Sequence, residues 1–224
     1  FLRWMERFPD VAAVAAAPEE DLLKAWEGLG YYRRARNIQA AARVIMERHG
    51  GNFPTSYADI LALPGIGDYT AGAIASTAYN EEVPCVDGNV ERVLSRVFDI
   101  DTPVKEEPAK SRIRELAQAL IPKGEARNFN QGLMELGALV CTPRSPSCAK
   151  CPLNGLCRAA AHGTQTRYPV LPEKKEKRKE RVFVFLLETP RGIAVRRRET
   201  GVLKGMDEFP SHVVKGEETP EEVL

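Results

Sequence analysis

The chain has 224 residues, of which 43% are hydrophobic and 28% charged, and its formal net charge is +1. These proportions are ordinary for a globular protein with a buried core, and the charge alone argues neither for nor against nucleic acid. No apolar run approaches the roughly 18 residues that a membrane-spanning helix needs, and no signal peptide is recognisable. Because the sequence begins at Phe1 inside an amphipathic segment and stops at Leu224 in mid-pattern, we expect an internal piece of a longer protein.

Helical periodicity dominates the first two-thirds of the chain. Pro18 and the three acidic residues after it have the signature of a helix start, because proline suits the first turn and acids suit the positive end of the dipole. A second helix is predicted over 32–49, where an apolar stripe runs up to Gly50. Strand alternation does not interrupt this region, so a mainly α fold is predicted. Further helices are predicted at 56–62, 69–79, 89–98, 109–121 and 127–140.

The composition changes after Cys157. Residues 161–180 are polar, charged and marked by prolines, as linkers are, and their basic run is expected to be a solvated surface. Segments 182–187 and 192–198 then have strand character. We predict that a β-containing second domain begins at about residue 181 and is incomplete at the end of the chain.

Four of the five cysteines, Cys141, Cys148, Cys151 and Cys157, follow the spacing Cys-x6-Cys-x2-Cys-x5-Cys. Thiols so close together predict a shared metal centre, with disulfides as a minor alternative. The spacing does not decide between zinc and iron. Zinc sites often pair two Cys-x2-Cys knuckles and here there is one, while all-cysteine ligation also suits a [4Fe–4S] cluster. Cys85 lies in another segment and is expected to be a small buried hydrophobe.

Residues 63–67 read Leu-Pro-Gly-Ile-Gly between two predicted helices. Gly65 and Gly67 allow a tight turn and a close backbone approach. The helix that follows offers unpaired N–H groups and the positive end of its dipole, which together make a natural phosphate site. An ordinary helix–turn–helix corner is the alternative.

Asp87 opens another predicted helix, in the sequence Val-Asp-Gly-Asn-Val. An aspartate in this position is usually only an N-cap. The functional alternative is a carboxylate that nearby N–H groups keep ionised and that faces a cationic transition state. Cleavage of an N-glycosidic bond builds positive charge on the sugar, and an ionised carboxylate beside the sugar would stabilise that charge.

Three motifs in this order, LPGIGDYTAGAI, VDGNVERVLSRV and CTPRSPSCAKCPLNGLC, resemble the helix-hairpin-helix DNA glycosylases that carry a C-terminal iron–sulfur loop. The resemblance covers roughly residues 1–160 and implies a [4Fe–4S] cluster on the four cysteines. Within that superfamily the chain is similar to the MutY-type adenine DNA glycosylases. Endonuclease III-type enzymes carry a nucleophilic lysine where this chain has Tyr69, and a DTHV-like stretch where it has DGNV.

The resemblance also implies a division into domains. A helical lobe with the hairpin would cover residues 1–82, and a second helical lobe with the cluster loop would cover residues 83–160. After the linker, residues 181–224 would form the first part of a Nudix-like domain. The segment RRRETGVLKGMDEFP resembles the opening of that domain, which helps to read 8-oxoguanine. Asp207 stands where the family usually has a large aromatic residue, so a weaker packing contact is expected there.

Roles for individual residues follow from the same resemblance. Asp87 would be the transition-state carboxylate, with Asn89 and Tyr69 helping to hold it and the sugar. Tyr31 would wedge into the DNA stack, with a plain core aromatic as the alternative, and Gln131 would lie near the adenine pocket. Gly65, Gly67 and Thr70 would contact the DNA backbone, and Arg144, Lys150 and Arg158 would face phosphates from the cluster loop.

The implied reaction is hydrolytic removal of adenine mispaired with 8-oxoguanine or guanine, after the base has left the stack. A monofunctional, monomeric glycosylase acting on double-stranded DNA in a bacterial cytoplasm is expected. The family's general-acid glutamate lies on a helix upstream of Phe1, and Glu6, Glu19 and Glu20 do not match its motif. We therefore expect a competent parent protein and an inactive fragment. An endonuclease III-like glycosylase/lyase and a non-catalytic lesion-binding relative are the alternatives.

Overall fold

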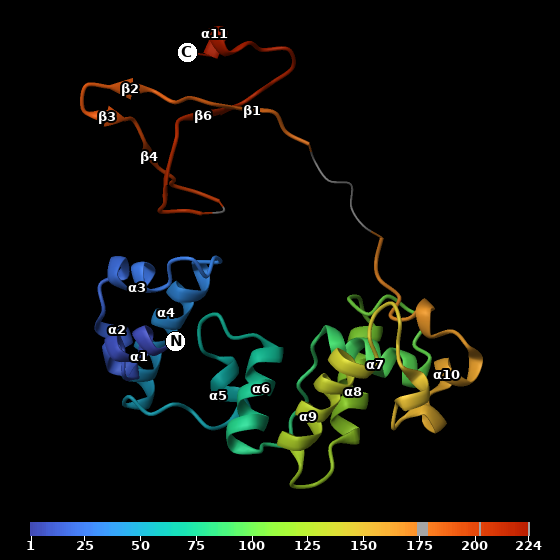
Figure 1. Cartoon of the computed structure of the whole chain (residues 1–224). Coiled ribbons are helices and arrows are strands. Elements are labelled where there is room, and N and C mark those ends of the chain that lie inside the picture. Colours follow the sequence, from blue (N-terminus) through green and yellow to red (C-terminus); the bar gives the residue numbers. More distant parts are fainter. Residues whose placement is uncertain (174–178, 202, 224) are drawn as a thin grey trace. The chain divides into compact units, whose positions relative to one another are not determined.

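The computed structural model describes residues 1–173, 179–201 and 203–223. The chain divides into two compact units, Phe1–Glu173 and Lys174–Leu224, and the division falls inside the segment predicted as a linker. Residues 174–178 of that segment lie outside the described residues. The first unit is helical and the second contains short strands (Figure 1). Among the described helices, none has the length and apolar character that crossing a membrane requires.

Helices make up the regular structure of the first unit, as the periodicity predicted. The helices predicted at 32–49, 56–62, 69–79, 89–98 and 109–121 are confirmed to within one residue at each end. The α-helices are α1 (Leu2–Arg7), α2 (Val11–Ala16), α3 (Glu19–Ala25), α4 (Arg33–His49), α5 (Tyr57–Leu61), α6 (Asp68–Tyr79), α7 (Gly88–Phe98), α8 (Ala109–Leu120), α9 (Ala126–Glu135) and α10 (Arg158–His162). Short turns of other helix types are η1 (Leu136–Val140), η2 (Cys148–Lys150), η3 (Asn154–Leu156) and η4 (Gln165–Arg167).

Helix α2 was not predicted, because its six residues are mostly alanine and show little periodicity. Asp10 caps it: the carboxylate accepts a hydrogen bond from the Ala13 N–H at 2.7 Å. Val14 places the helix on a buried cluster that also contains Phe8 and Leu22. Helix α2 is too short to be stable in isolation, so tertiary packing and the Asp10 cap stabilise it.

The prediction of one continuous α-helix over 127–140 is wrong for residues 136–140. Helix α9 gives way to the π-helical turn η1, in which the Cys141 N–H donates to the Leu136 carbonyl at 2.7 Å. Gly137 lies against α7 here, and a Cβ on Gly137 would come within 2.6 Å of the Asn89 Cβ. Widened turns of this kind occur often at functional sites.

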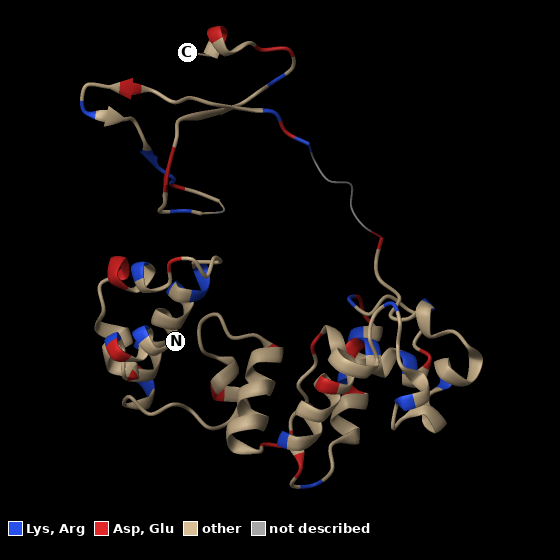
Figure 2. Ribbon diagram, in the orientation of Figure 1, with Lys and Arg blue, Asp and Glu red and all other residues tan. Residues whose placement is uncertain are grey.

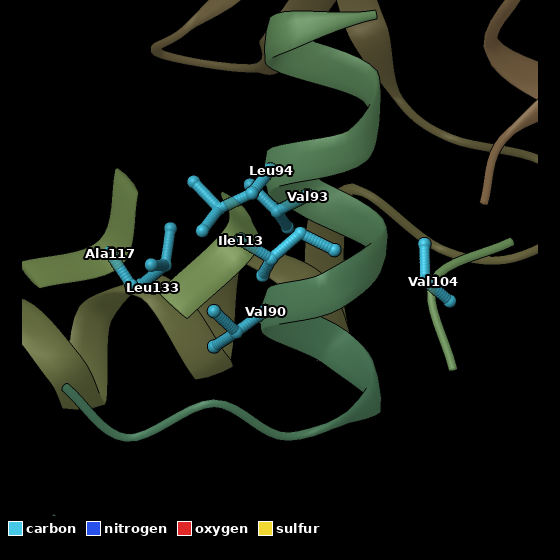
Figure 3. Close-up of a cluster of buried hydrophobic side chains, with 7 residues drawn as sticks. All are labelled: Val90, Val93, Leu94, Val104, Ile113, Ala117 and Leu133. Atoms are coloured by element: carbon cyan, nitrogen blue, oxygen red, sulfur yellow. The ribbon is translucent and has the colours of Figure 1, made fainter. Parts of the chain in front are cut away.

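Helix α7 lies at the centre of a buried cluster in the second half of the unit (Figure 3). Burial of each such aliphatic side chain stabilises the fold by about 1.5–3 kcal/mol. The packing fixes the direction of α7, and with it the position of the residue at its N-terminus. The cluster consists of Val90, Val93, Leu94, Val104, Ile113, Ala117 and Leu133.

Helix α6 is almost uncharged and apolar (Figure 2). Ala71, Gly72, Ala75 and Ser76 are its buried residues. These small side chains let α6 pack closely against α5 on one side and α9 on the other. Helix α6 therefore joins the hairpin to the part of the unit that contains α7 and α9.

The second unit contains short antiparallel pairs of strands. The predicted strand at 182–187 is regular only over its first half, and the one at 192–198 is interrupted. Asp207, expected to weaken a packing contact, lies opposite Arg197 and forms a cross-strand ion pair at 3.0 Å. The elements are β1 (Val182–Val184), β2 (Glu188–Thr189), β3 (Gly192–Ile193), β4 (Arg196–Arg197), β5 (Asp207–Glu208), β6 (Ser211–Val213) and α11 (Pro220–Val223), paired as β1–β6, β2–β3 and β4–β5.

Candidate functional site

Asp87 is the N-cap of α7, as the simpler interpretation of the sequence predicted. Its Oδ1 accepts hydrogen bonds from the backbone N–H groups of Asn89 and Val90, both at 2.8 Å. Its Oδ2 accepts a third, at 2.8 Å, from the Asn89 side-chain amide. The carboxylate satisfies backbone N–H groups that the helix leaves unpaired, and the positive end of the dipole favours a negative charge there. The same contacts hold the carboxylate in one orientation, so a cap and a functional carboxylate are compatible.

Arg92 connects this carboxylate to the cysteine loop. Its Nη2 donates to the Asn89 Oδ1 and to the Gly137 carbonyl, both at 2.8 Å. Its Nε donates to the Cys141 carbonyl at 2.8 Å. Arg92 is buried, and that burial lowers the pKa of its guanidinium from the ordinary value. Asn89, which holds Asp87, is therefore itself held from behind by Arg92.

Arg96, one turn further along α7, is 1% exposed, and its guanidinium donates hydrogen bonds on both sides of the cysteine loop. These contacts join the start of the cysteine loop to the segment beyond its end. A buried guanidinium of this kind can satisfy several carbonyls at once because its donors point in fixed directions. The acceptors are the carbonyls of Cys141, Thr142, Pro143, Gln165 and Tyr168 and the Sγ of Cys141.

Cys141, Cys148, Cys151 and Cys157 line one cavity, together with apolar side chains of α7 and η1. All four are free thiols and partly buried. Over residues 1–173, 179–201 and 203–223, no three His, Cys, Asp or Glu side chains converge closely enough to hold a single metal ion. Four thiols that line one cavity match the all-cysteine ligation of a [4Fe–4S] cluster.

Replacement of Cys148 by Ser is expected to remove most of the bound iron, because the serine hydroxyl binds the iron of such a cluster more weakly than a cysteine thiolate does. Protein purified without oxygen should contain about four irons per chain, and the variant far fewer. Metal analysis and visible absorption measure this. Cys85→Ser is the matched control and should keep its iron; stoichiometric zinc in the wild-type protein would contradict the prediction.

The hairpin at 63–67 has the tight turn that its glycines predicted. Gly65 has a φ of +76°, and a Cβ there would lie 2.5 Å from the Asn37 Cγ on α4. Gly67 is the N-cap of α6 and has no side chain to bond the first N–H groups of that helix. Thr70 is exposed beside them. The end of α6 therefore keeps donors available, as a phosphate site requires.

Gly65→Ala is expected to lower the free energy of unfolding by about 1–3 kcal/mol, because the new methyl group both strains the backbone and overlaps Asn37. Thermal or urea unfolding measures the loss. Gly67→Ala is the control, since Gly67 has an extended backbone and nothing within 4 Å of the new Cβ. Equal losses in the two variants would show that the close approach at Gly65 is unimportant.

One contact at the hairpin was not predicted. Asp68 Oδ1 accepts hydrogen bonds from the Tyr57 hydroxyl and from Arg114 Nη1, both at 3.0 Å. The Tyr57 hydroxyl, and after it the Arg114 guanidinium, lower the pKa of the Asp68 carboxyl. Arg114 lies on α8, so this contact fastens the hairpin to the second half of the unit.

Tyr69 and Cys85 lie close to Asp87. The Cys85 Sγ is 3.8 Å from the Tyr69 carbonyl. Burial, and then the Asp87 charge, raises the pKa of the Cys85 thiol to about 11, and Cys85 is a buried hydrophobe as expected. Burial also raises the pKa of Tyr69, and the charges of Cys85 and Asp87 raise it further. The structure thus brings Tyr69, on the hairpin helix, into the electrostatic reach of Asp87.

Tyr31 is 83% exposed, so the alternative of a core aromatic is wrong. Its φ is +49°, and the Arg34 guanidinium lies 5.6 Å from its ring. Gln131 is also exposed and donates to Glu135 at 3.1 Å. Its neighbour Asn130, which the sequence did not single out, is the buried residue at this point of α9.

The hairpin, the capped aspartate and the thiol-lined cavity define a class of protein. Residues 1–123 match the family described as HhH-GPD superfamily base excision DNA repair protein, and residues 141–157 match the iron–sulfur binding domain of endonuclease III. The chain belongs to the HhH-GPD superfamily, and its cysteine loop is an iron–sulfur binding domain for a [4Fe–4S] cluster.

Among curated proteins the chain is similar to adenine DNA glycosylases. It is 36% identical to that of Arabidopsis thaliana over 97% of this chain and 40% of the relative. It is 38% identical to that of Buchnera aphidicola (Schizaphis graminum) over 78% and 50%, and 44% identical to that of Homo sapiens over 70% and 29%. The chain thus spans half or less of the length of these relatives.

Solved structures with the same fold include a thermostable thymine-DNA glycosylase, with a TM-score of 0.65 and 30% identity over 71% of this chain and 74% of that one. A non-covalent complex of endonuclease III with DNA gives a TM-score of 0.62 and 28% identity over 73% and 75%. The mainly α, helix-hairpin-helix fold expected from the sequence is confirmed.

Proposed function

We propose that the whole protein is a base excision repair glycosylase that hydrolyses the N-glycosidic bond of adenine mispaired with 8-oxoguanine or guanine. The observation that carries the proposal is the Asp87 carboxylate, held by three hydrogen bonds beside a hairpin helix that presents Tyr69 where a lyase would present an amine. The similarity to adenine DNA glycosylases of several organisms supports the same choice of base.

Asp87 would act on the sugar. As the bond to adenine breaks, positive charge develops on the sugar ring, and a carboxylate already oriented by fixed donors stabilises that charge without reorganising. Asn89 keeps the carboxylate in place, and Tyr69 would help to hold the sugar. Because no lysine stands at position 69, water rather than a protein amine would complete the reaction.

Adenine would be protonated by the general-acid glutamate that the resemblance places upstream of Phe1.

The DNA would be held in several places. The hairpin would contact phosphate through the N–H groups framed by Gly65 and Gly67 and through Thr70, and Tyr31 would enter the stack. Gln131 would lie near the extruded adenine. With its cluster bound, the cysteine loop is cross-linked through its four thiolates and would present Arg144, Lys150 and Arg158 to phosphates. A monomer working on DNA in a bacterial cytoplasm completes the proposal.

Release of free base tests the proposal. The whole protein would be incubated with duplexes that carry adenine opposite 8-oxoguanine, guanine or thymine, and the released base identified by chromatography. We expect adenine from the first two duplexes and almost none from the third. A protein that binds the mispair and releases no base would be a non-catalytic relative, and this outcome would overturn the proposal.

A further inference from the structure

The short segment 83–85, just ahead of Asp87, is gripped from one side by Asn130 of α9. Asn130 is 2% exposed. Its Nδ2 donates to the Val83 carbonyl at 2.9 Å, and its Oδ1 accepts from the Cys85 N–H at 3.2 Å. One amide thus pairs with a donor and an acceptor of the same backbone segment, as a neighbouring β-strand would.

Helix α6 closes the other side of the segment. A Cβ on Gly72 would overlap the Pro84 carbonyl oxygen, so the backbone of 83–85 passes directly over this glycine. The Cys85 side chain lies between the two helices, 3.8 Å from the Tyr69 carbonyl on α6 and 3.8 Å from the Met134 Sδ on α9. The close contact with Gly72 prevents segment 83–85 from moving toward α6. The two hydrogen bonds to Asn130 fix its position relative to α9.

We propose that Asn130 is a positioning residue for Asp87. Only Val86 separates Asp87 from the gripped Cys85, and consecutive Cα atoms lie about 3.8 Å apart, so a shift of Cys85 would act on the chain directly before Asp87. The N–H donors that hold Asp87 belong to α7, whereas Asn130 sets where the chain enters α7. The inference rests on the proposed function, because the position of Asp87 matters for a reaction only if Asp87 takes part in one.

Asn130→Ala is expected to slow adenine release by about 10-fold or more in a single turnover of the whole protein, because small displacements of a catalytic group cost rate rather than binding. The Kd for a duplex with an abasic-site analogue should stay unchanged. In residues 1–224 alone, amide exchange at Asn89 and Val90, which donate to Asp87, should become faster. Asn130→Asp, of nearly equal size, keeps the acceptor for the Cys85 N–H but turns a carboxylate oxygen toward the Val83 carbonyl, and should give a change of the same kind if the alanine variant does not fold.

Asn80 offers a matched control. It grips backbone in the same way, donating to the Gly124 carbonyl at 2.6 Å and accepting from the Arg127 N–H at 2.9 Å. Its φ is +55°, so Asn80→Gly removes the side chain without strain. This variant should lose stability but leave adenine release and exchange at Asn89 and Val90 unchanged.

Asn130 is no positioning residue if its variants slow release no more than Asn80→Gly does, or if exchange at Asn89 and Val90 is unaltered. Wild-type protein that releases no adenine would instead refute the proposed function, and the exchange measurement would still decide whether Asn130 positions Asp87.

Discussion

Asp87→Asn is expected to slow adenine release on the order of 10³-fold, because the side chain keeps its size but loses the charge that stabilises the sugar cation. The asparagine can still accept from the Asn89 and Val90 N–H groups, so the helix cap and the fold should survive. Single-turnover release from an 8-oxoguanine:adenine duplex measures the effect, and binding of the same duplex should be unchanged.

Asp10→Asn is the control for this substitution. Asp10 caps α2 through the Ala13 N–H at 2.7 Å, so the chemical change and the structural role are the same. Its adenine release should match that of the wild-type protein. An Asp87→Asn enzyme as active as the Asp10 variant would leave Asp87 with a capping role alone.

Arg96→Met should lower the free energy of unfolding by roughly 3 kcal/mol or more, because it removes several hydrogen bonds of a buried guanidinium, and hydrogen bonds to charged groups contribute about 1.5–3 kcal/mol each. The variant removes hydrogen bonds to Thr142 and Pro143 at 2.8 and 2.9 Å, as well as the contact with the Cys141 Sγ. The loop should then hold its cluster poorly. Thermal unfolding and iron content per chain measure the two effects.

Arg144→Met is the matched control, because Arg144 is an exposed residue of the same loop. It should keep its stability and its iron, although DNA binding should weaken if Arg144 faces phosphate. Full iron content in Arg96→Met would show that the loop folds around its cluster without the buried guanidinium.

The helices of the first unit were predictable where the buried apolar residues recur at the helical period. In α7, Val90, Val93 and Leu94 are buried at helical spacing, and the capping aspartate marks the start. In α2 the period was hidden by alanine. In η1 the π turn lies against Asn89, which is far from Gly137 in sequence. Local sequence carries no sign of such a contact.

The site was predictable in its chemistry and in the local support that Asn89 gives to Asp87, but not in its distant supports. The aspartate and the four cysteines were visible from residue type and spacing, whereas Asn130, Arg92 and Arg96 make contacts 45 to 72 positions away. A signal existed for Arg92 and Arg96: they lie four residues apart beside the buried stripe of α7, where a cation needs partners. Asn130 gave no such signal, because an asparagine beside an exposed glutamine is unremarkable until α9 is placed against 83–85.

The state of the DNA strand after base loss tests the central claim most directly. The whole protein would be incubated with an end-labelled 8-oxoguanine:adenine duplex, with and without borohydride, and each sample divided before treatment with alkali. With Tyr69 in place of an amine, we predict strand scission only after alkali and no trapped adduct. Efficient borohydride trapping, or scission without alkali, would contradict the assignment of the chemistry to Asp87 and water.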